Sequence, residues 1–146
     1  MSNAICPDTS VERNEHARLE RLALEAREGL HPVAGFLLSE LRRAHIADDT
    51  LSSEPVVGLD RWVTFSTDLE QNQTRILVHP GEYFSSRHQL SVLSPIGAAL
   101  LGLSAGDRMP FVSLEGAQHI VTVVGIGTIS VVAPFARSGT YQPENS

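Results

Sequence analysis

The stretch QLSVLSPIGAALLGLSAGD, residues 89–107, decides most of the fold of this chain. Its first residues alternate between apolar and polar, which is typical of the end of a β-strand. Ser94 is a favoured N-cap, and Pro95 suits the first helical position because the N–H that proline lacks would have no partner there. Gly102 can adopt the left-handed conformation that ends a helix. The stretch therefore predicts a strand, a sharp corner, a helix of about two turns and a return strand.

The composition is that of one domain, with room for a small appendage. The 146 residues are 42% hydrophobic, and no apolar run approaches the roughly 18 residues of a membrane span. Cys6 is the single cysteine, which excludes an internal disulfide and a cysteine-rich zinc site. We find no secretory signal pattern and expect a cytoplasmic protein. The net charge of −6 argues against a protein that grips nucleic acid by its phosphates, and it suits a protein partner with a basic surface.

Two segments upstream have helical periodicity, residues 8–26 and residues 32–47. Asp8, Thr9 or Ser10 can cap the first helix, and Pro32 can begin the second. Their apolar stripes are Leu19, Leu22, Ala26 and Leu30 in the first segment, and Val33, Leu37, Leu41 and Ala44, broadened by Phe36, in the second. Because the break between the segments is short, we expect an antiparallel helical hairpin, a short coiled coil.

After Pro55 the period changes from helical to alternating, which indicates strands. We expect them at residues 56–58 and 62–65, 74–79, 90–93, 109–112 and 118–126. Helices on one side of such an antiparallel sheet define an α+β fold. We divide the chain into a flexible N-terminus (1–7), the hairpin (8–48), a linker (49–58), the sheet domain (59–132) and a flexible tail (133–146).

The sequence carries no recognisable catalytic constellation. No phosphate-binding glycine motif follows a strand and opens a helix, and the glycines at 125 and 127 start no helix. The six histidines are scattered, and no two have the i, i+4 spacing of a helical zinc site. We therefore predict no catalytic residue, no cofactor and no metal site.

The run LSVLSPIGAALLGL, residues 90–103, followed by Gly106 and Asp107, resembles the carboxy-terminal domain of the bacterial transcript-cleavage factors GreA and GreB. It looks closer still to the branch of that family named for regulation of nucleoside diphosphate kinase, Rnk. The resemblance covers about residues 59–130 and the order of parts, a helical hairpin and then a sheet domain. It implies an FKBP-like sheet domain that docks on RNA polymerase, at the rim of its secondary channel, with the hairpin pointing inward.

By position, the resemblance suggests Ser94, Pro95 and Ile96 as polymerase contacts, with Gln89 and Ser91 nearby. The residue before the Ser-Pro pair is polar or acidic in Gre factors and is Leu93 here, which fits the Rnk branch better. The corner also has a purely structural explanation, since Ser94 and Pro95 cap a helix whether or not anything binds.

Gre factors stimulate transcript cleavage with two acidic side chains at the hairpin tip, which reach the catalytic magnesium of the polymerase. Glu25 and Glu28 lie near the predicted tip and share one helix face. A Gre hairpin is markedly longer, however, and two or three missing turns leave the tip roughly 10–15 Å short. Because a carboxylate must approach Mg²⁺ to about 2.1 Å, we expect polymerase binding without cleavage. A shortened cleavage factor and an FKBP-like peptidyl-prolyl isomerase are the alternatives, although 5% aromatic residues are few for an isomerase pocket.

Overall fold

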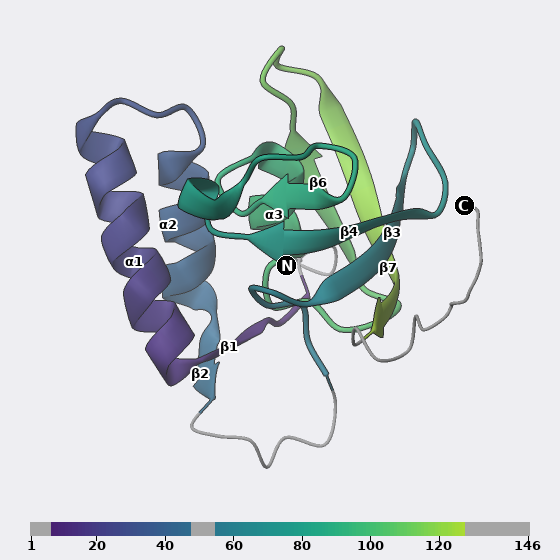
Figure 1. Ribbon diagram of the computed structural model, residues 1–146, viewed down its shortest axis with the longest axis horizontal. Helices are drawn as coiled ribbons and strands as arrows, with labels where there is room; N and C mark the ends of the chain where they lie inside the picture. Colours follow the sequence, from purple (N-terminus) through teal and green to yellow (C-terminus); the bar gives the residue numbers. More distant parts are fainter. Residues whose placement is uncertain (1–6, 48–54, 128–146) are drawn as a thin grey trace.

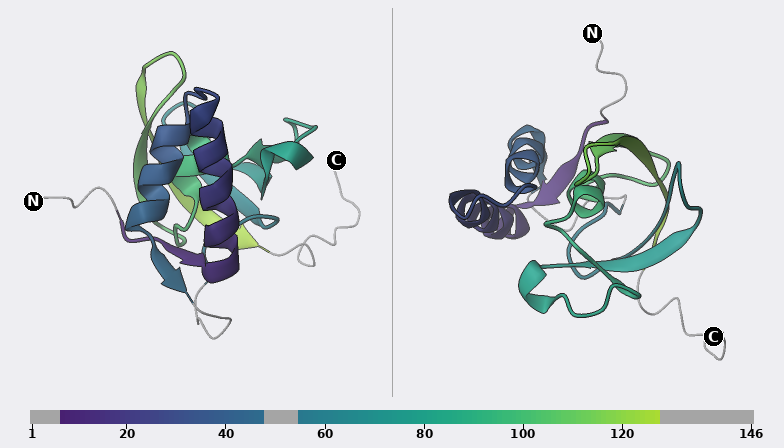
Figure 2. Two further views of the ribbon diagram at one scale, coloured as in Figure 1. Left: turned by 90° about the vertical axis from the view of Figure 1, so that its left-hand side faces the viewer. Right: turned by 90° about the horizontal axis from the view of Figure 1, so that it is seen from above.

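The computed structural model describes residues 7–47 and 55–127 (Figure 1). Two helices stand at one side of a curled sheet, and a third, short helix packs against both the second helix and the sheet (Figure 2). This arrangement is an α+β fold, as the sequence predicted. Of the predicted flexible ends and linker, only residues 7 and 55–58 fall within the described ranges.

The main sheet has five strands in the order β5-β4-β3-β7-β6. They are β3 (Trp62–Thr67), β4 (Gln73–Val78), β5 (Gln89–Ser91), β6 (Arg108–Val112) and β7 (Gln118–Gly127). All neighbours are antiparallel except β4 and β5, which pair in parallel, with Leu77 opposite Leu90. The prediction of a purely antiparallel sheet was therefore wrong at this edge. The segment between these strands, which includes the one-turn helix η1 (Pro80–Glu82), carries the chain back to the end of the sheet where β4 began.

The two long helices are α1 (Arg13–Glu28) and α2 (Ala34–Arg43), and they run side by side in opposite directions (Figure 1). Both are displaced from their predicted ranges because the flanking segments form a small parallel sheet, in which β1 (Ser10–Glu12) pairs with β2 (His45–Ala47). The prediction that residues 8–12 and 45–47 are helical was wrong.

The starts of the two long helices also differ from the prediction, since α2 begins at Ala34 and not at Pro32. The Glu12 carboxylate caps α1 by accepting the N–H of Glu15 at 3.0 Å, so the cap is neither Asp8, Thr9 nor Ser10. Leu30 does not join the buried stripe, since it lies past the end of α1 and is 88% exposed. The stripe on α1 is centred on Leu19 and Ala23 instead.

The corner after β5 forms as the sequence predicted. Ser94 caps α3 (Pro95–Leu100), because its Oγ accepts the N–H of Gly97 at 3.1 Å and donates to the carbonyl of Ser91 at 2.6 Å. Gly102, with a φ of 82°, follows the helix in the left-handed conformation. The predicted strand at residues 56–58 does not form. Val57 instead exchanges backbone hydrogen bonds with the residues that leave α3, donating to Leu103 and accepting from Gly102.

One hydrophobic core joins the helices to the sheet. Leu19 of α1 and Leu37 and Leu41 of α2 belong to the same buried cluster as Leu100 of α3 and Val121 of β7. Each of these side chains is at most 1% exposed. The helical pair therefore has no separate core and is held in a fixed position against the sheet.

Glu15 links the helices to the chain segment that enters the sheet. Its carboxylate accepts the N–H of Leu59 at 2.6 Å, and both of its oxygens lie against Gly58. Burial raises the pKa of Glu15 above its ordinary value of 4.5, although the Leu59 N–H and the charge of Arg61 pull it down. The contact thus depends on an acceptor atom more than on a negative charge.

A Glu15→Gln substitution should retain stability at neutral pH, because the amide oxygen can still accept the Leu59 N–H without the cost of burying a charge. Since the pKa of Glu15 is raised in the folded chain, its contribution to stability is fully present below the unfolded pKa and is lost as pH rises through the folded pKa. The advantage of the Gln variant over the parent should therefore grow as pH rises from about 4 to 7. Urea denaturation at several pH values measures it.

Glu15→Ala is the matched control, since it leaves the Leu59 N–H without an acceptor. We expect it to cost about 1–3 kcal/mol. If the Gln variant lost as much stability as the Ala variant at pH 7, the charge of Glu15 would be what the fold requires, and our assignment would be wrong.

Candidate functional site

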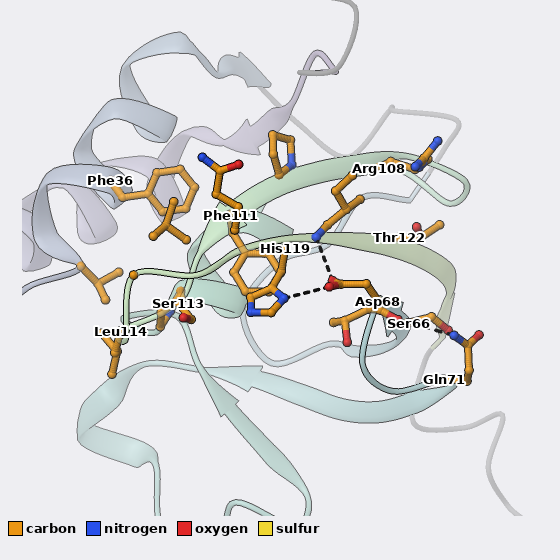
Figure 3. A pocket seen from close by; sticks show the side chains of 18 of the residues that line it. Phe36, Ser66, Asp68, Gln71, Arg108, Phe111, Ser113, Leu114, His119 and Thr122 are labelled. Carbon is orange, nitrogen blue, oxygen red and sulfur yellow. Dashed lines mark hydrogen bonds and ion pairs between the residues drawn. The ribbon is translucent and has the colours of Figure 1, made fainter.

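An open groove of about 1410 Å³ runs between the helical pair and the outer face of the sheet. The start of α2 and the loop before it form one wall, and the loop between β3 and β4 forms the other (Figure 3). Strands β6 and β7 and the turn between them form the floor. Pro95, at the start of α3, also lines the groove. Segments from four separate parts of the chain therefore meet in one concave surface.

The floor of the groove is unusually apolar for a solvent-facing surface. Val112, Ile120 and Val124 line it with exposed fractions of 54%, 41% and 50%, and Leu114 in the β6–β7 turn is 65% exposed. Apolar side chains clustered in a concave surface, unlike scattered ones, mark contact sites for other molecules.

A bulge in β7 contributes to this floor. Thr64 of β3 pairs with Gly125, whereas the next residue, Phe65, pairs with Val123, so Val124 is an extra residue with no partner in β3. A bulge bends its strand and redirects a side chain. The bulged residue is therefore Val124, which extends the apolar floor of the groove toward the end of β7.

A polar cluster stands on the far wall of the groove. Asp68 joins the β3–β4 loop to β7, since one carboxylate oxygen lies 2.9 Å from Nδ1 of His119 and the other accepts the N–H of Ile120 at 3.1 Å (Figure 3). The His119 ring packs on Phe111 with 5.4 Å between ring centres. The hydrogen bond from His119, followed by that from Ile120, lowers the pKa of Asp68. Asp68 therefore keeps its negative charge beside the apolar floor down to acidic pH.

The structure divides the predicted contact residues into two kinds. The polar side chains are engaged within the chain: Ser94 caps α3, the Ser91 hydroxyl accepts the N–H of Leu93, and Oε1 of Gln89 accepts the N–H groups of Phe84 and Ser85. Of the apolar residues, Pro95 lines the groove, and Ile96 is partly buried against the core. Only Pro95 of the five predicted residues belongs to the groove.

Glu25 and Glu28 lie on the exposed side of the last turn of α1 and do not line the groove. Within residues 7–47 and 55–127, the His, Cys, Asp and Glu side chains form no group of three or more that could hold a metal ion. No helix in this part of the chain is both long enough and apolar enough to cross a membrane.

Most of the groove could not be predicted from the sequence, because its walls come from elements distant in the chain. One signal was present in β7, where Ile120 and Val124 fall on the face opposite Val121 and Val123. A half-buried strand with apolar residues on both faces indicates a second contact surface. Asp68 and His119 are 51 positions apart, and no local pattern pairs them.

The chain belongs to the GreA/GreB family. The family described as "Transcription elongation factor, GreA/GreB, C-term" matches residues 52–128, just over half of the chain. Two curated relatives, from Escherichia coli (strain K12) and Shigella flexneri, both called "Regulator of nucleoside diphosphate kinase", are 40% identical over 80 residues. The match covers 53% of this chain and 58% of each relative, so it spans less than two thirds of their length.

A solved structure extends the likeness beyond the sheet domain. "Prokaryotic transcription elongation factor GreA/GreB from Nitrosomonas europaea" is 28% identical, with a TM-score of 0.63 over 82% of this chain and 98% of that chain. The similarity inferred from residues 90–107 to the GreA/GreB family and its Rnk branch is confirmed by these comparisons.

Proposed function

We propose that this chain is a non-enzymatic transcription regulator that binds RNA polymerase near its secondary channel and does not stimulate transcript cleavage. The observation that carries the proposal is the groove, in which Pro95 of the family-like corner joins a solvent-exposed apolar floor. The GreA/GreB family assignment and the likeness to regulators of nucleoside diphosphate kinase support this kind of partner. The sheet domain acts in this proposal as an FKBP-like docking module.

The chemistry of the groove suits a protein partner. Its floor offers Val112, Ile120 and Val124 for burial, and burying such a side chain contributes about 1.5–3 kcal/mol when it is complete. Asp68 provides one fixed negative charge at the wall, and the net charge of −6 favours a partner with a basic surface. Polar contacts would then orient the partner over an apolar centre, as in ordinary protein interfaces.

The dimensions of the helical pair support binding without cleavage. The 16 residues of α1 span about 24 Å and the 10 residues of α2 about 15 Å, at ~1.5 Å per residue. Helix α2 is shorter than the sequence predicted, so the part of the hairpin in which the two helices pack side by side is also shorter. Glu25 and Glu28 would therefore remain ordinary surface carboxylates when the sheet domain is docked, and neither would reach a metal at the polymerase centre.

Competition for core RNA polymerase tests the proposal. Titration of the chain should displace a fluorescently labelled Gre-type cleavage factor, measured by anisotropy. A Val112→Asp, Val124→Asp double variant should weaken displacement at least about tenfold, because both side chains are exposed on the groove floor and charges there would have to be buried. Phe84→Asp is the matched control, since Phe84 is 85% exposed and does not line the groove.

Absence of displacement at concentrations far above those that saturate the cleavage factor would refute polymerase binding at this site. Equal effects of the groove variant and the Phe84 variant would refute the groove as the docking surface. Transcript cleavage accelerated by the parent chain, and abolished by Glu28→Ala, would support the shortened cleavage factor instead. Cis–trans isomerisation of a proline tetrapeptide should proceed no faster with the chain than without it.

A further inference from the structure

The turn between α1 and α2 places a leucine in a backbone conformation that leucine disfavours. Leu30 has a φ of 62°, in the left-handed region. Its N–H donates to the carbonyl of Arg27 at 2.9 Å, and the N–H of His31 donates to the carbonyl of Ala26 at 2.9 Å. These two bonds form a Schellman motif, in which the left-handed residue is usually glycine because it carries no Cβ.

The chain has a glycine beside this position, and that glycine does not occupy it. Gly29 has a φ of −87°, which any residue can adopt. The reverse order, leucine and then glycine, would make the same turn without strain. Two other non-glycine residues in the described ranges have positive φ, Asp60 and Asn72, and both are of types that tolerate this conformation. Leu30 is thus the one outlier among them.

Leu30 is also 88% exposed, the largest exposed fraction among the big apolar side chains of the described ranges. Phe84, at 85%, is nearly as exposed, but its backbone is not in the left-handed region. Leu30 therefore carries two costs, backbone strain and apolar exposure, and the described fold gains nothing from either. An observed outlier of this kind points to a role outside the folded chain itself.

We propose that Leu30 is the apolar anchor of a second contact, which inserts into an apolar pocket on the protein that occupies the groove. This inference rests on the proposed function and takes the same partner, RNA polymerase. The two contacts are close together, since Pro32 and Val33, two and three positions after Leu30 in the chain, line the groove. In the last turn of α1 the exposed carboxylates of Glu25 and Glu28 outnumber the single cation, Arg27, and the carbonyl end of the helix adds to the negative side, so the rim of the pocket should be basic.

The structure also explains how this leucine can bind efficiently. The two Schellman bonds fix the backbone at Leu30, and the core shared with the sheet fixes the helices that carry it. The side chain is therefore held outward before the partner arrives, and little backbone freedom is lost on binding.

Leu30→Gly separates this role from a structural one. Because the substitution removes the strain, the melting temperature should rise by roughly 1–4 °C. Affinity for core RNA polymerase, measured by the same displacement of the labelled factor, should fall about tenfold or more, the loss expected for removing a buried leucine from an interface. A Leu30→Gly variant that is more stable but binds polymerase more weakly would show that Leu30 serves binding and not the fold.

Two variants complete the design. Gly29→Ala should leave affinity unchanged, because its added Cβ meets only backbone oxygens at 3.6 and 3.9 Å, which is ordinary contact. Leu30→Met should also retain affinity, since it preserves an apolar side chain of similar volume. A parent chain that does not bind polymerase would overturn both the proposed function and this inference. A parent chain that binds, with a Leu30→Gly variant that binds equally well, would overturn the inference alone, as would a sharp fall in the melting temperature of that variant.

Discussion

Gly97→Ala should destabilise the chain by about 3 kcal/mol or more, a large part of the stability of an ordinary domain. A Cβ added at Gly97 would lie 2.0 Å from the carbonyl oxygen of Ser91 and 2.9 Å from its carbonyl carbon. Both are backbone atoms of the strand that precedes α3, so no side-chain rotation can relieve the overlap. The corner would have to open, and the Ser94 cap that defines α3 would be disturbed with it. Urea denaturation followed by circular dichroism measures the loss, and the melting temperature should fall by about 10 °C or more.

Gly35→Ala is the matched control, because Gly35 is also a helical glycine and an added Cβ there meets nothing within 4 Å. In α2 this change should stabilise the chain by about 0.5–1 kcal/mol. If the two variants were equally stable, the close approach of Gly97 to Ser91 would not be a feature of the folded chain. The glycine of the Ser-Pro-x-Gly motif therefore has a structural reason that is independent of any partner.

Gly102→Ala should cost about 2–5 kcal/mol, the second largest effect we expect, because two penalties add. The φ of 82° is strained for alanine by about 1–2 kcal/mol, and the new Cβ would lie 2.8 Å from Cβ of Thr9. It would also lie 3.1 Å from the carbonyl oxygen of Ser10. Overpacking of this kind adds about 1–3 kcal/mol. The N–H of Ser10 donates to the carbonyl of Gly102, so the substitution should loosen the junction of β1 with the sheet domain.

Gly106→Ala separates the cost of backbone strain from the cost of overpacking. Gly106 has a φ of 91°, but an added Cβ there meets nothing within 4 Å, so only backbone strain applies. The difference between the two variants in urea denaturation should then measure the steric term at Thr9 and Ser10. Equal losses would mean that the junction tolerates an extra methyl group, contrary to the packing described above.

The elements that could be predicted from the sequence are those fixed by neighbouring residues. The α3 corner was correct because Ser94, Pro95 and Gly102 each act within a few positions of the chain. The β1–β2 pair was missed because Ser10 pairs with His45, 35 positions away, and three-residue strands show no periodicity. The parallel pairing of β5 was missed for a related reason, since alternation reveals a strand but not its direction.

In the candidate site, too, only features fixed by neighbouring residues could be predicted. Pro95 could be placed from the family resemblance, whereas the groove around it depends on how α2, β6, β7 and the β3–β4 loop meet in space. The serines and the glutamine of the predicted contact set satisfy backbone groups nearby, and their contact with a partner stays a prediction. Leu30 was assigned to a buried stripe because its spacing fits one, although it falls in the predicted break between the helices, and the structure shows it exposed in that turn with a positive φ.

Because α1 packs against α2, the distance that the hairpin tip can reach is set by helix lengths that keep the buried faces together. The tip could be moved outward only by lengthening both helices together, because an insertion in one would turn the buried side chains of that helix away from the other. Seven residues in each helix come close to restoring the same face, and they add about 10 Å. A smaller insertion between Leu19 and Ala23, or between Leu37 and Leu41, would rotate one residue of that pair out of the core that they share with the sheet. The reach of a protein built this way therefore changes in large steps, and relatives with different reach should differ by whole blocks of paired residues.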